Sequence, residues 1–184
     1  MNVIEIENVT KTFGQLIAVK SLSLNVPQGS IYGFIGPNGS GKTTTLRMIM
    51  RIYHPDGGSG RIRVLGSEAF TAANDRIGYL PEERGLYKKM TLMEVMMYMA
   101  QLKGCSASYV RNNADRWLER MGLMDYKKRK VEELSKGMQQ KLQFVTTILH
   151  DPDLIILDEL FSGLDPLNIE LIKDILLERK RAGK

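Results

Sequence analysis

The sequence predicts an α/β fold with an N-terminal antiparallel β layer, a core of parallel strands and an inserted α-helical subdomain. Three patterns indicate this fold. Residues 1–30 alternate apolar and polar side chains, the period of half-buried strands. Two short apolar runs, residues 30–35 and 154–157, have the length of buried strands and each lead into a motif of glycines or acids. Residues 91–150, between these runs, follow helical spacing instead.

The elements follow one another in a simple order. The β layer leads into the apolar strand at 30–35, a glycine-rich turn and a helix over 43–52. A helix begins near Thr91, because Thr91 and Glu94 are spaced as a capping box ahead of an apolar run that ends near Gly104. The other elements that we expect are strands at 61–65, 76–80 and 154–157, two or three further helices before residue 150, and a last helix over 166–181.

Composition excludes several classes of protein. The chain has 184 residues, of which 43% are hydrophobic and 26% charged, enough for one substantial core. No apolar run approaches the roughly 18 residues of a membrane span, and the first residues do not resemble a secretion signal. Cys105 is the one cysteine, which excludes an internal disulfide and indicates a stray thiol in a reducing compartment.

The net charge of +5 suits ATP, nucleic acid or an anionic membrane surface, and by itself decides among none of them. The densest basic block is KKRK at residues 127–130. It lacks interleaved aromatic residues that stack on bases, so we expect a solvated face and no nucleic-acid partner. Proximity to lipid headgroups is the functional alternative.

Methionines crowd the first helix of the helical subdomain, at positions 90, 93, 96, 97 and 99. Because methionine is flexible and polarizable, the simplest use of these side chains is adaptable core packing. The alternative is an apolar surface for a partner helix.

Residues 36–43, GPNGSGKT, fit the G-x-x-x-x-G-K-[ST] pattern of a phosphate-binding loop and stand between an apolar strand and a helix. Such a loop surrounds phosphates with backbone N–H groups at the positive end of the helix, its lysine reaches the β and γ phosphates, and its threonine binds Mg²⁺. A chance match in a flexible loop is the alternative, which the strand and helix context disfavours. The predicted nucleotide-binding residues here are Gly36, Pro37, Asn38, Gly39, Ser40, Gly41, Lys42, Thr43 and Thr44.

Two acids follow the apolar run at residues 154–157. A carboxylate at the end of a buried strand can hold Mg²⁺ beside a phosphate-binding loop, and we assign this role to Asp158. Glu159 is then placed to orient and polarise the attacking water. The alternative interpretation is an ordinary polar turn, which the presence of a phosphate-binding loop in the same chain disfavours.

Between these motifs lies LSKGMQQK at residues 134–141, and with it the chain resembles the ATP-binding cassette (ABC) ATPase family. The stretch is close to the family's LSGGQ signature, and its SKGM variant resembles bacterial exporters of the sodium and drug efflux type. The resemblance covers the whole chain and implies a P-loop NTPase (RecA-like) core. It divides the chain into β layer and P-loop core (1–90), helical subdomain (91–150), and Walker B strand with the last helix (151–184). An ordinary helix N-cap at Ser135 is the structural reading of the same motif.

The resemblance also implies roles for other residues and partners. Ser135 and Gly137 would contact the γ-phosphate held by a second copy, so that ATP joins two subunits. Asp165 lies in SGLD at 162–165, which matches the loop that contacts the partner's phosphate-binding loop, and Phe13 falls where the family stacks an aromatic ring on adenine. The helices from Thr91 onward would contact a separate membrane permease, at the cytoplasmic face of the cell membrane.

Three positions depart from the family pattern. Glu82 stands where a glutamine usually senses Mg²⁺ and γ-phosphate. At about 5 Å from a phosphate charge and an effective dielectric of about 20, its carboxylate would meet on the order of 3 kcal/mol of repulsion, so it either faces the metal or swings away. Leu160 replaces the proline that usually follows the catalytic glutamate. Neither His54 nor His150 is placed to serve as the family's switch histidine.

In the family, the switch histidine ends a further strand after the last helix, between the strands that correspond to residues 30–35 and 154–157. The resemblance therefore implies a C-terminally incomplete cassette. We expect residues 1–184 alone to be marginally folded, or repaired by direct pairing of these two strands or by a strand from elsewhere, and to hydrolyse ATP poorly.

The most favoured function is an ATP-hydrolysing motor subunit that dimerises around ATP and drives export through the permease. A degenerate or truncated cassette that binds ATP without efficient hydrolysis is the alternative. A soluble ABC protein of translation or DNA maintenance is disfavoured, because those proteins resemble paired cassettes or cassettes split by long coiled coils.

Overall fold

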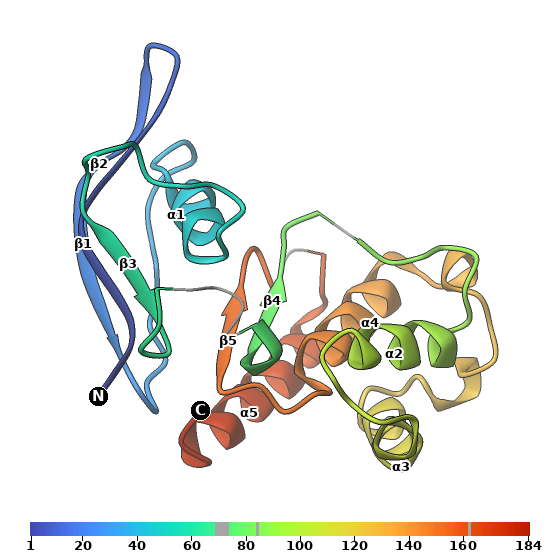
Figure 1. The fold of residues 1–184 in the computed structure, drawn as a ribbon. Helices are drawn as coiled ribbons and strands as arrows, with labels where there is room; N and C mark the ends of the chain where they lie inside the picture. The colour runs from blue at the N-terminus through green and yellow to red at the C-terminus, as the bar shows by residue number, and fades with distance from the viewer. Residues whose placement is uncertain (69–73, 84, 162) are drawn as a thin grey trace. The chain divides into compact units, whose positions relative to one another are not determined.

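A computed structural model describes residues 1–68, 74–83, 85–161 and 163–184 of the chain (Figure 1). The chain forms two compact units. The first comprises Met1–Asn74 and Glu178–Lys184, and the second comprises Asp75–Leu177.

The first unit contains a three-stranded antiparallel sheet in the order β2-β1-β3 (Figure 1). Its strands are β1 (Asn2–Phe13), β2 (Leu16–Pro27) and β3 (Arg61–Val64), and helix α1 (Lys42–Ile49) contacts β2 and β3. The predicted alternation is confirmed in β3 and the first half of β1, where apolar side chains at every second position, such as Ile4 and Ile6, are buried. The buried hydrophobic residues described in this unit are Ile4, Ile6, Val9, Val19, Val26, Met48, Ile49, Met50, Ile62 and Val64.

The second unit is built on a parallel pair of strands, β4 (Ile77–Leu80) and β5 (Leu154–Leu157). Its helices are α2 (Leu92–Gln101), α3 (Ala107–Arg120), α4 (Lys136–Ile148) and most of α5 (Pro166–Arg181), with 3-10 turns at Asn74–Arg76, Met124–Tyr126 and Val131–Glu133. Phe144, Leu118 and Met96 are among its fully buried side chains, in one apolar core that the four helices share. Among the described residues, no helix has the length and apolar character that crossing a membrane requires.

The start of α2 follows the sequence-based prediction. The backbone N–H of Glu94 donates to the Thr91 hydroxyl over 3.3 Å, and the Glu94 carboxylate accepts the Thr91 N–H over 2.7 Å, so the capping box is formed. The methionines of this region pack in or against the core: Met96 is fully buried, and Met90, Met93, Met97 and Met99 are partly buried beside it. The core-packing interpretation of these methionines is therefore confirmed.

The predicted strand at residues 30–35 was wrong. The segment belongs to no strand among the described residues, and Ile31, Phe34 and Ile35 are 56%, 36% and 95% exposed. A strand exists only where a neighbour pairs with its backbone, and here the neighbouring strands in the sheets are β2-β1-β3 and β4-β5. The apolar run alone does not supply that neighbour. Helix α1 also ends at Ile49 rather than at residue 52.

Helix α4 lies directly against β4 at Gly78. A Cβ atom at this position would stand 2.3 Å from the Thr147 carbonyl oxygen and 3.1 Å from Pro152 Cγ. We expect Gly78→Ala to lower the free energy of unfolding by about 1–3 kcal/mol, because backbone has to move to admit the methyl group. Thermal unfolding measures the loss. Gly85→Ala is the matched control, since a Cβ there meets nothing within 4 Å; an equal loss in both variants would contradict the close packing.

Candidate functional site

The phosphate-binding loop is anchored to the sheet of the first unit through Gly41. This residue caps the N-terminus of α1 with φ of 86°, and a Cβ atom there would lie 2.4 Å from the Ala18 carbonyl oxygen and 3.1 Å from Val19 Cγ2. Both the left-handed backbone and the close approach to β2 require glycine. The loop is thereby held against the strand just where it enters the helix.

Lys42 folds back over this loop. Its Nζ donates to the carbonyl oxygens of Gly36 over 2.8 Å and Pro37 over 2.9 Å, and the Ser40 N–H donates to the Pro37 carbonyl over 3.2 Å. The structure therefore brings the predicted loop residues together around the ammonium group. Thr43 and Thr44 occupy the first turn of α1, half-buried, while Pro37, Asn38, Gly39 and Ser40 are exposed.

The first turn of α1 contains no acidic residue. The free N–H groups of a helix start carry partial positive charge, and here the Lys42 ammonium adds a full one. This end of the helix therefore favours a phosphate group over a cation.

Phe13 ends β1 and lies on the same sheet as the strand that contacts the loop. The ring is 41% exposed, and it meets the Tyr53 ring edge to face with centroids 5.2 Å apart. Lys11 Nζ lies 5.3 Å from the Phe13 centroid. A partly exposed aromatic face remains, which is what stacking on a base requires.

Asp158 stands at the carboxyl end of β5 in the second unit. Its backbone N–H donates to the Leu80 carbonyl over 2.9 Å, which extends the ladder between the parallel strands by one residue. The side chain is only 7% exposed, and its Oδ2 has no hydrogen-bond partner among the described residues. A buried carboxylate oxygen without a donor is costly unless a cation or another donor meets it.

Glu159 follows in a strained conformation. Its φ is 53°, in the left-handed region that a residue with a side chain seldom adopts, and the side chain is exposed. Such strain costs on the order of 1–3 kcal/mol and is concentrated at functional sites.

Glu82 lies at the same edge of the sheet as Asp158. Leu80 and Leu157 are paired in register, and Glu82 and Asp158 follow them by two residues and one residue. Because the carboxyl ends of parallel strands share one edge, Glu82, Asp158 and Glu159 all follow this edge, although among the described residues no three acidic, histidine or cysteine side chains gather closely enough to hold a metal ion. Glu82 is exposed, so its side chain is able to turn in either direction.

Ser135 caps helix α4, as the structural reading of the signature expects. Its hydroxyl accepts the Met138 N–H over 3.3 Å. Gly137, in the first turn, lies near the chain after the Walker B motif, since a Cβ there would be 3.8 Å from the Gly163 carbonyl oxygen. Ser162, in the same predicted loop, lies outside the described residues.

Asp165 caps the last helix, α5. Its carboxylate accepts the backbone N–H of Asn168 over 3.0 Å and the Asn168 side-chain amide, and these donors hold the pKa of Asp165 below its usual value. Burial lowers the pKa of Lys141 on α4. The negative charge of Asp165 opposes that shift, so the two side chains interact electrostatically. The predicted signature and the predicted contact loop are therefore neighbours within the second unit.

Two buried residues of this region were not predicted. Gln140 and Gln143 of α4 donate to the carbonyl oxygens of Leu160 and Glu83, in the loops that follow β5 and β4. A signal existed in the sequence, since both glutamines occupy positions that face the core in an amphipathic helix. Their partners were not visible there.

His150 lies away from the candidate-site carboxylates of the second unit. The ring Nε2 of His150 lies 3.3 Å from the carbonyl oxygen of Ile77, the first residue of β4, at the opposite end of the strand from Glu82. Burial lowers the pKa of His150, and Lys103 adds to the effect.

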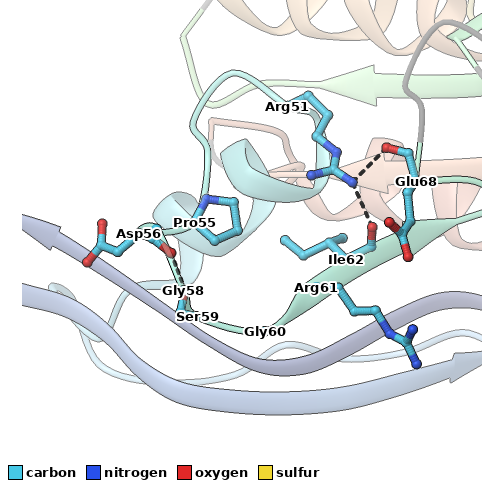
Figure 2. A pocket seen from close by; sticks show the side chains of 10 residues that line it. Arg51, Pro55, Asp56, Gly58, Ser59, Gly60, Arg61, Ile62 and Glu68 are labelled. Atoms are coloured by element: carbon cyan, nitrogen blue, oxygen red, sulfur yellow. Dashed lines mark hydrogen bonds between the residues drawn. The ribbon is translucent and has the colours of Figure 1, made fainter.

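A pocket of about 270 Å³ in the first unit lies beyond the other end of α1 (Figure 2). Arg51 reaches across it, and one guanidinium nitrogen donates to the carbonyl oxygens of Ile62 over 2.7 Å and Glu68 over 2.8 Å. None of the predicted site residues lines this pocket, and its two arginines are both paired, Arg51 with these carbonyl oxygens and Arg61 with the Glu7 carboxylate.

A family model described as ABC transporter matches residues 19–162, which include the phosphate-binding loop, the signature stretch and both acids. The chain belongs to the ABC transporter family. The resemblance inferred from the motifs is thus confirmed, and so is the predicted α/β fold class with its antiparallel β layer.

Curated relatives agree with this membership. The uncharacterized ABC transporter ATP-binding protein YhaQ of Bacillus subtilis is 48% identical over 97% of this chain, and the match covers 59% of YhaQ. The bacitracin transport ATP-binding protein BcrA of Enterococcus faecalis is 36% identical over 95% of this chain and 56% of its own length. This ABC chain therefore spans somewhat more than half the length of these relatives.

Solved structures share the fold of this ABC chain. An ATP-binding subunit of an ABC transporter has a TM-score of 0.89 and 28% identity, covering 98% of this chain and 76% of its own. A nucleotide-free ATP-binding cassette from an ABC transporter has a TM-score of 0.80 and 25% identity, covering 100% and 79%.

Proposed function

We propose that this chain binds ATP through residues 36–44 and hydrolyses it with Glu159, as the motor subunit of an exporter. The observation that carries the proposal is the buried Asp158 carboxylate, whose Oδ2 has no hydrogen-bond partner among the described residues, directly before Glu159 at the end of β5. A polar turn without a ligand would expose such a carboxylate or give it a donor. Membership in the ABC transporter family supports the same function.

The proposed ATP-binding residues act mainly by recognising the phosphate groups. The glycines at 36, 39 and 41 let backbone N–H groups approach the phosphates, the start of α1 adds partial positive charge, and Lys42 exchanges its two carbonyl acceptors for β- and γ-phosphate oxygens. Phe13 then stacks on the adenine. Because these groups act on charge and shape, the binding step requires no covalent chemistry.

Asp158 fits a divalent cation, because a buried carboxylate oxygen that lacks a donor is a ligand of the kind that Mg²⁺ prefers. The residues that would hold the ion are Thr43, Asp158 and, where its carboxylate turns inward, Glu82. An ion held there would supply positive charge that offsets the negative charge of the phosphates.

Glu159 acts on the attacking water. Its carboxylate accepts a proton from the water, or orients the water in line with the γ-phosphate, and phosphate and ADP leave as products. The Glu159 side chain is exposed, so water has access to its carboxylate.

The signature residues extend the proposal to a dimer. Ser135, Gly137 and Asp165 would contact the nucleotide or the phosphate-binding loop of a second copy, so that two subunits close around ATP. The helices over residues 91–130 would contact a membrane permease at the cytoplasmic face of the cell membrane. Cysteine cross-linking to a co-purified permease tests this placement, and contacts confined to residues 1–30 would contradict it.

Glu82→Gln is expected to leave the fold intact and to keep or raise the affinity for Mg-ATP. The substitution removes a negative charge that repels the phosphates and leaves an amide oxygen that still coordinates. Titration with a fluorescent ATP analogue at several Mg²⁺ concentrations measures both constants. A large loss of Mg²⁺ affinity would show that Glu82 acts as a metal ligand through its charge, and would contradict this expectation.

A further inference from the structure

Two glutamines on α4 are buried where the helix otherwise presents apolar side chains. Gln140 and Gln143 are each 5% exposed, and they alternate along the buried face with Leu142, Phe144 and Val145. A buried side-chain amide destabilises a core unless its polar atoms are paired. The hydrogen-bond partner of each buried amide therefore indicates the role of that glutamine.

Gln140 holds the loop after β5. Its Nε2 donates to the carbonyl oxygen of Leu160 over 3.3 Å in a buried setting. Leu160 is the residue after Glu159, and its own side chain is buried. The hydrogen bond therefore fixes the chain immediately beyond the strained turn from which the Glu159 carboxylate projects.

Gln143, one turn further along, holds the loop after β4. Its Nε2 donates to the carbonyl oxygen of Glu83 over 3.4 Å, next to Glu82. Its Oε1 is buried and has no partner among the described residues. The amide is thus able to accept an N–H from this loop as well as to donate to it, so a small shift of the loop exchanges one hydrogen bond for another.

Helix α4 packs closely against β4 near its C-terminus, and its N-terminus carries the signature residues. Near its C-terminus, the Thr147 carbonyl oxygen lies so close to Gly78 that β4 admits no side chain there. At its N-terminus, the helix begins with Ser135 and Gly137 of the signature. A single helix therefore runs from the signature, past both loops that carry the carboxylates, to the strand pair.

We propose that Gln140 and Gln143 are positioning residues that couple the signature end of α4 to the Glu159 and Glu82 loops. Contact of Ser135 with nucleotide displaces or steadies the helix start, and the two amides pass that change to the carboxylates. The inference rests on the proposed ATPase function and adds to it a route by which the signature regulates the hydrolytic step. It predicts an effect on turnover rather than on nucleotide binding.

The test uses the full-length protein with Gln140→Met and Gln143→Met, since methionine keeps the length of glutamine and removes its polar atoms. Thr146→Val is the matched control. Thr146 lies on the same helix, and its hydroxyl donates only within it, to the Gln143 carbonyl over 2.8 Å. Steady-state phosphate release gives kcat and KM, a fluorescent ATP analogue gives affinity, and thermal unfolding reports stability.

Each methionine variant is expected to lose kcat by on the order of tenfold, with KM and ATP affinity within about twofold of the parent, since a misplaced catalytic group slows chemistry without weakening binding. Thr146→Val should match the parent in all three. Unchanged kcat in both methionine variants would overturn the inference, and so would their failure to fold, which would assign the amides a purely structural role. If the unsubstituted protein does not hydrolyse ATP, both the proposed function and this inference are contradicted. If it hydrolyses ATP and both methionine variants keep its kcat, the inference alone is contradicted.

Discussion

Glu159→Gln should reduce phosphate release by at least about a hundredfold while ATP remains bound, since a general base typically contributes 10²–10⁴-fold. Glutamine preserves the shape of the side chain and the strained turn, but its amide accepts a proton from water far less readily than a carboxylate. The phosphate-binding loop and Asp158 are untouched, so the nucleotide stays. Because ATP is bound and not consumed, dimers closed around ATP should accumulate.

Single-turnover phosphate release and size-exclusion chromatography with ATP measure these two effects. Glu170→Gln is the matched control, because Glu170 is an exposed acid on α5 whose partner is Lys173 over 2.7 Å. The control should keep the parental rate. A Glu159→Gln variant that hydrolyses ATP at the parental rate would remove Glu159 from the proposed role.

Lys42→Ala should weaken ATP binding by about a hundredfold, which corresponds to the roughly 1.5–3 kcal/mol of a hydrogen bond to a charged group. The ammonium group is the cation that the loop itself carries, and its carbonyl acceptors at Gly36 and Pro37 show that it is already directed over the loop. Because Lys42 exchanges these carbonyl acceptors for phosphate oxygens on binding, the loss of the ammonium group acts mainly on the ATP-bound state.

Equilibrium titration with a fluorescent ATP analogue measures this loss, with the exposed Lys128→Ala as the matched control. Lys42→Arg is a second informative variant, because the planar guanidinium is longer than the ammonium and fits the loop differently. Unchanged affinity in Lys42→Ala would contradict the assignment of residues 36–43 as a phosphate-binding loop.

Features that are encoded locally were predictable from the sequence. The alternation of apolar and polar residues predicts the β layer, because a sheet with one buried face requires an apolar side chain at every second residue. The capping box at Thr91 involves residues three apart and formed as predicted. The run Leu154–Leu157 is apolar throughout and is β5 in the structure, with β4 as its neighbour.

Features that depend on distant partners were not predictable. Residues 30–35 also carry a largely apolar run, yet they form no strand among the described residues, because strand formation depends on a neighbour that the segment itself does not encode. The left-handed turn at Glu159 and the buried amides of Gln140 and Gln143 are likewise outcomes of packing. The sequence motifs predicted the residues of the candidate site. The structure adds the hydrogen bonds by which α4 contacts the loops after β4 and β5.

The proposed ATPase function is tested by phosphate release from the full-length protein as the Mg-ATP concentration is raised. We expect release that saturates with Mg-ATP, stops when Mg²⁺ is chelated, and falls to background in the Lys42→Ala protein. Release that stays at background in the parent at every Mg-ATP concentration, or that is the same in Lys42→Ala, would contradict the proposed function.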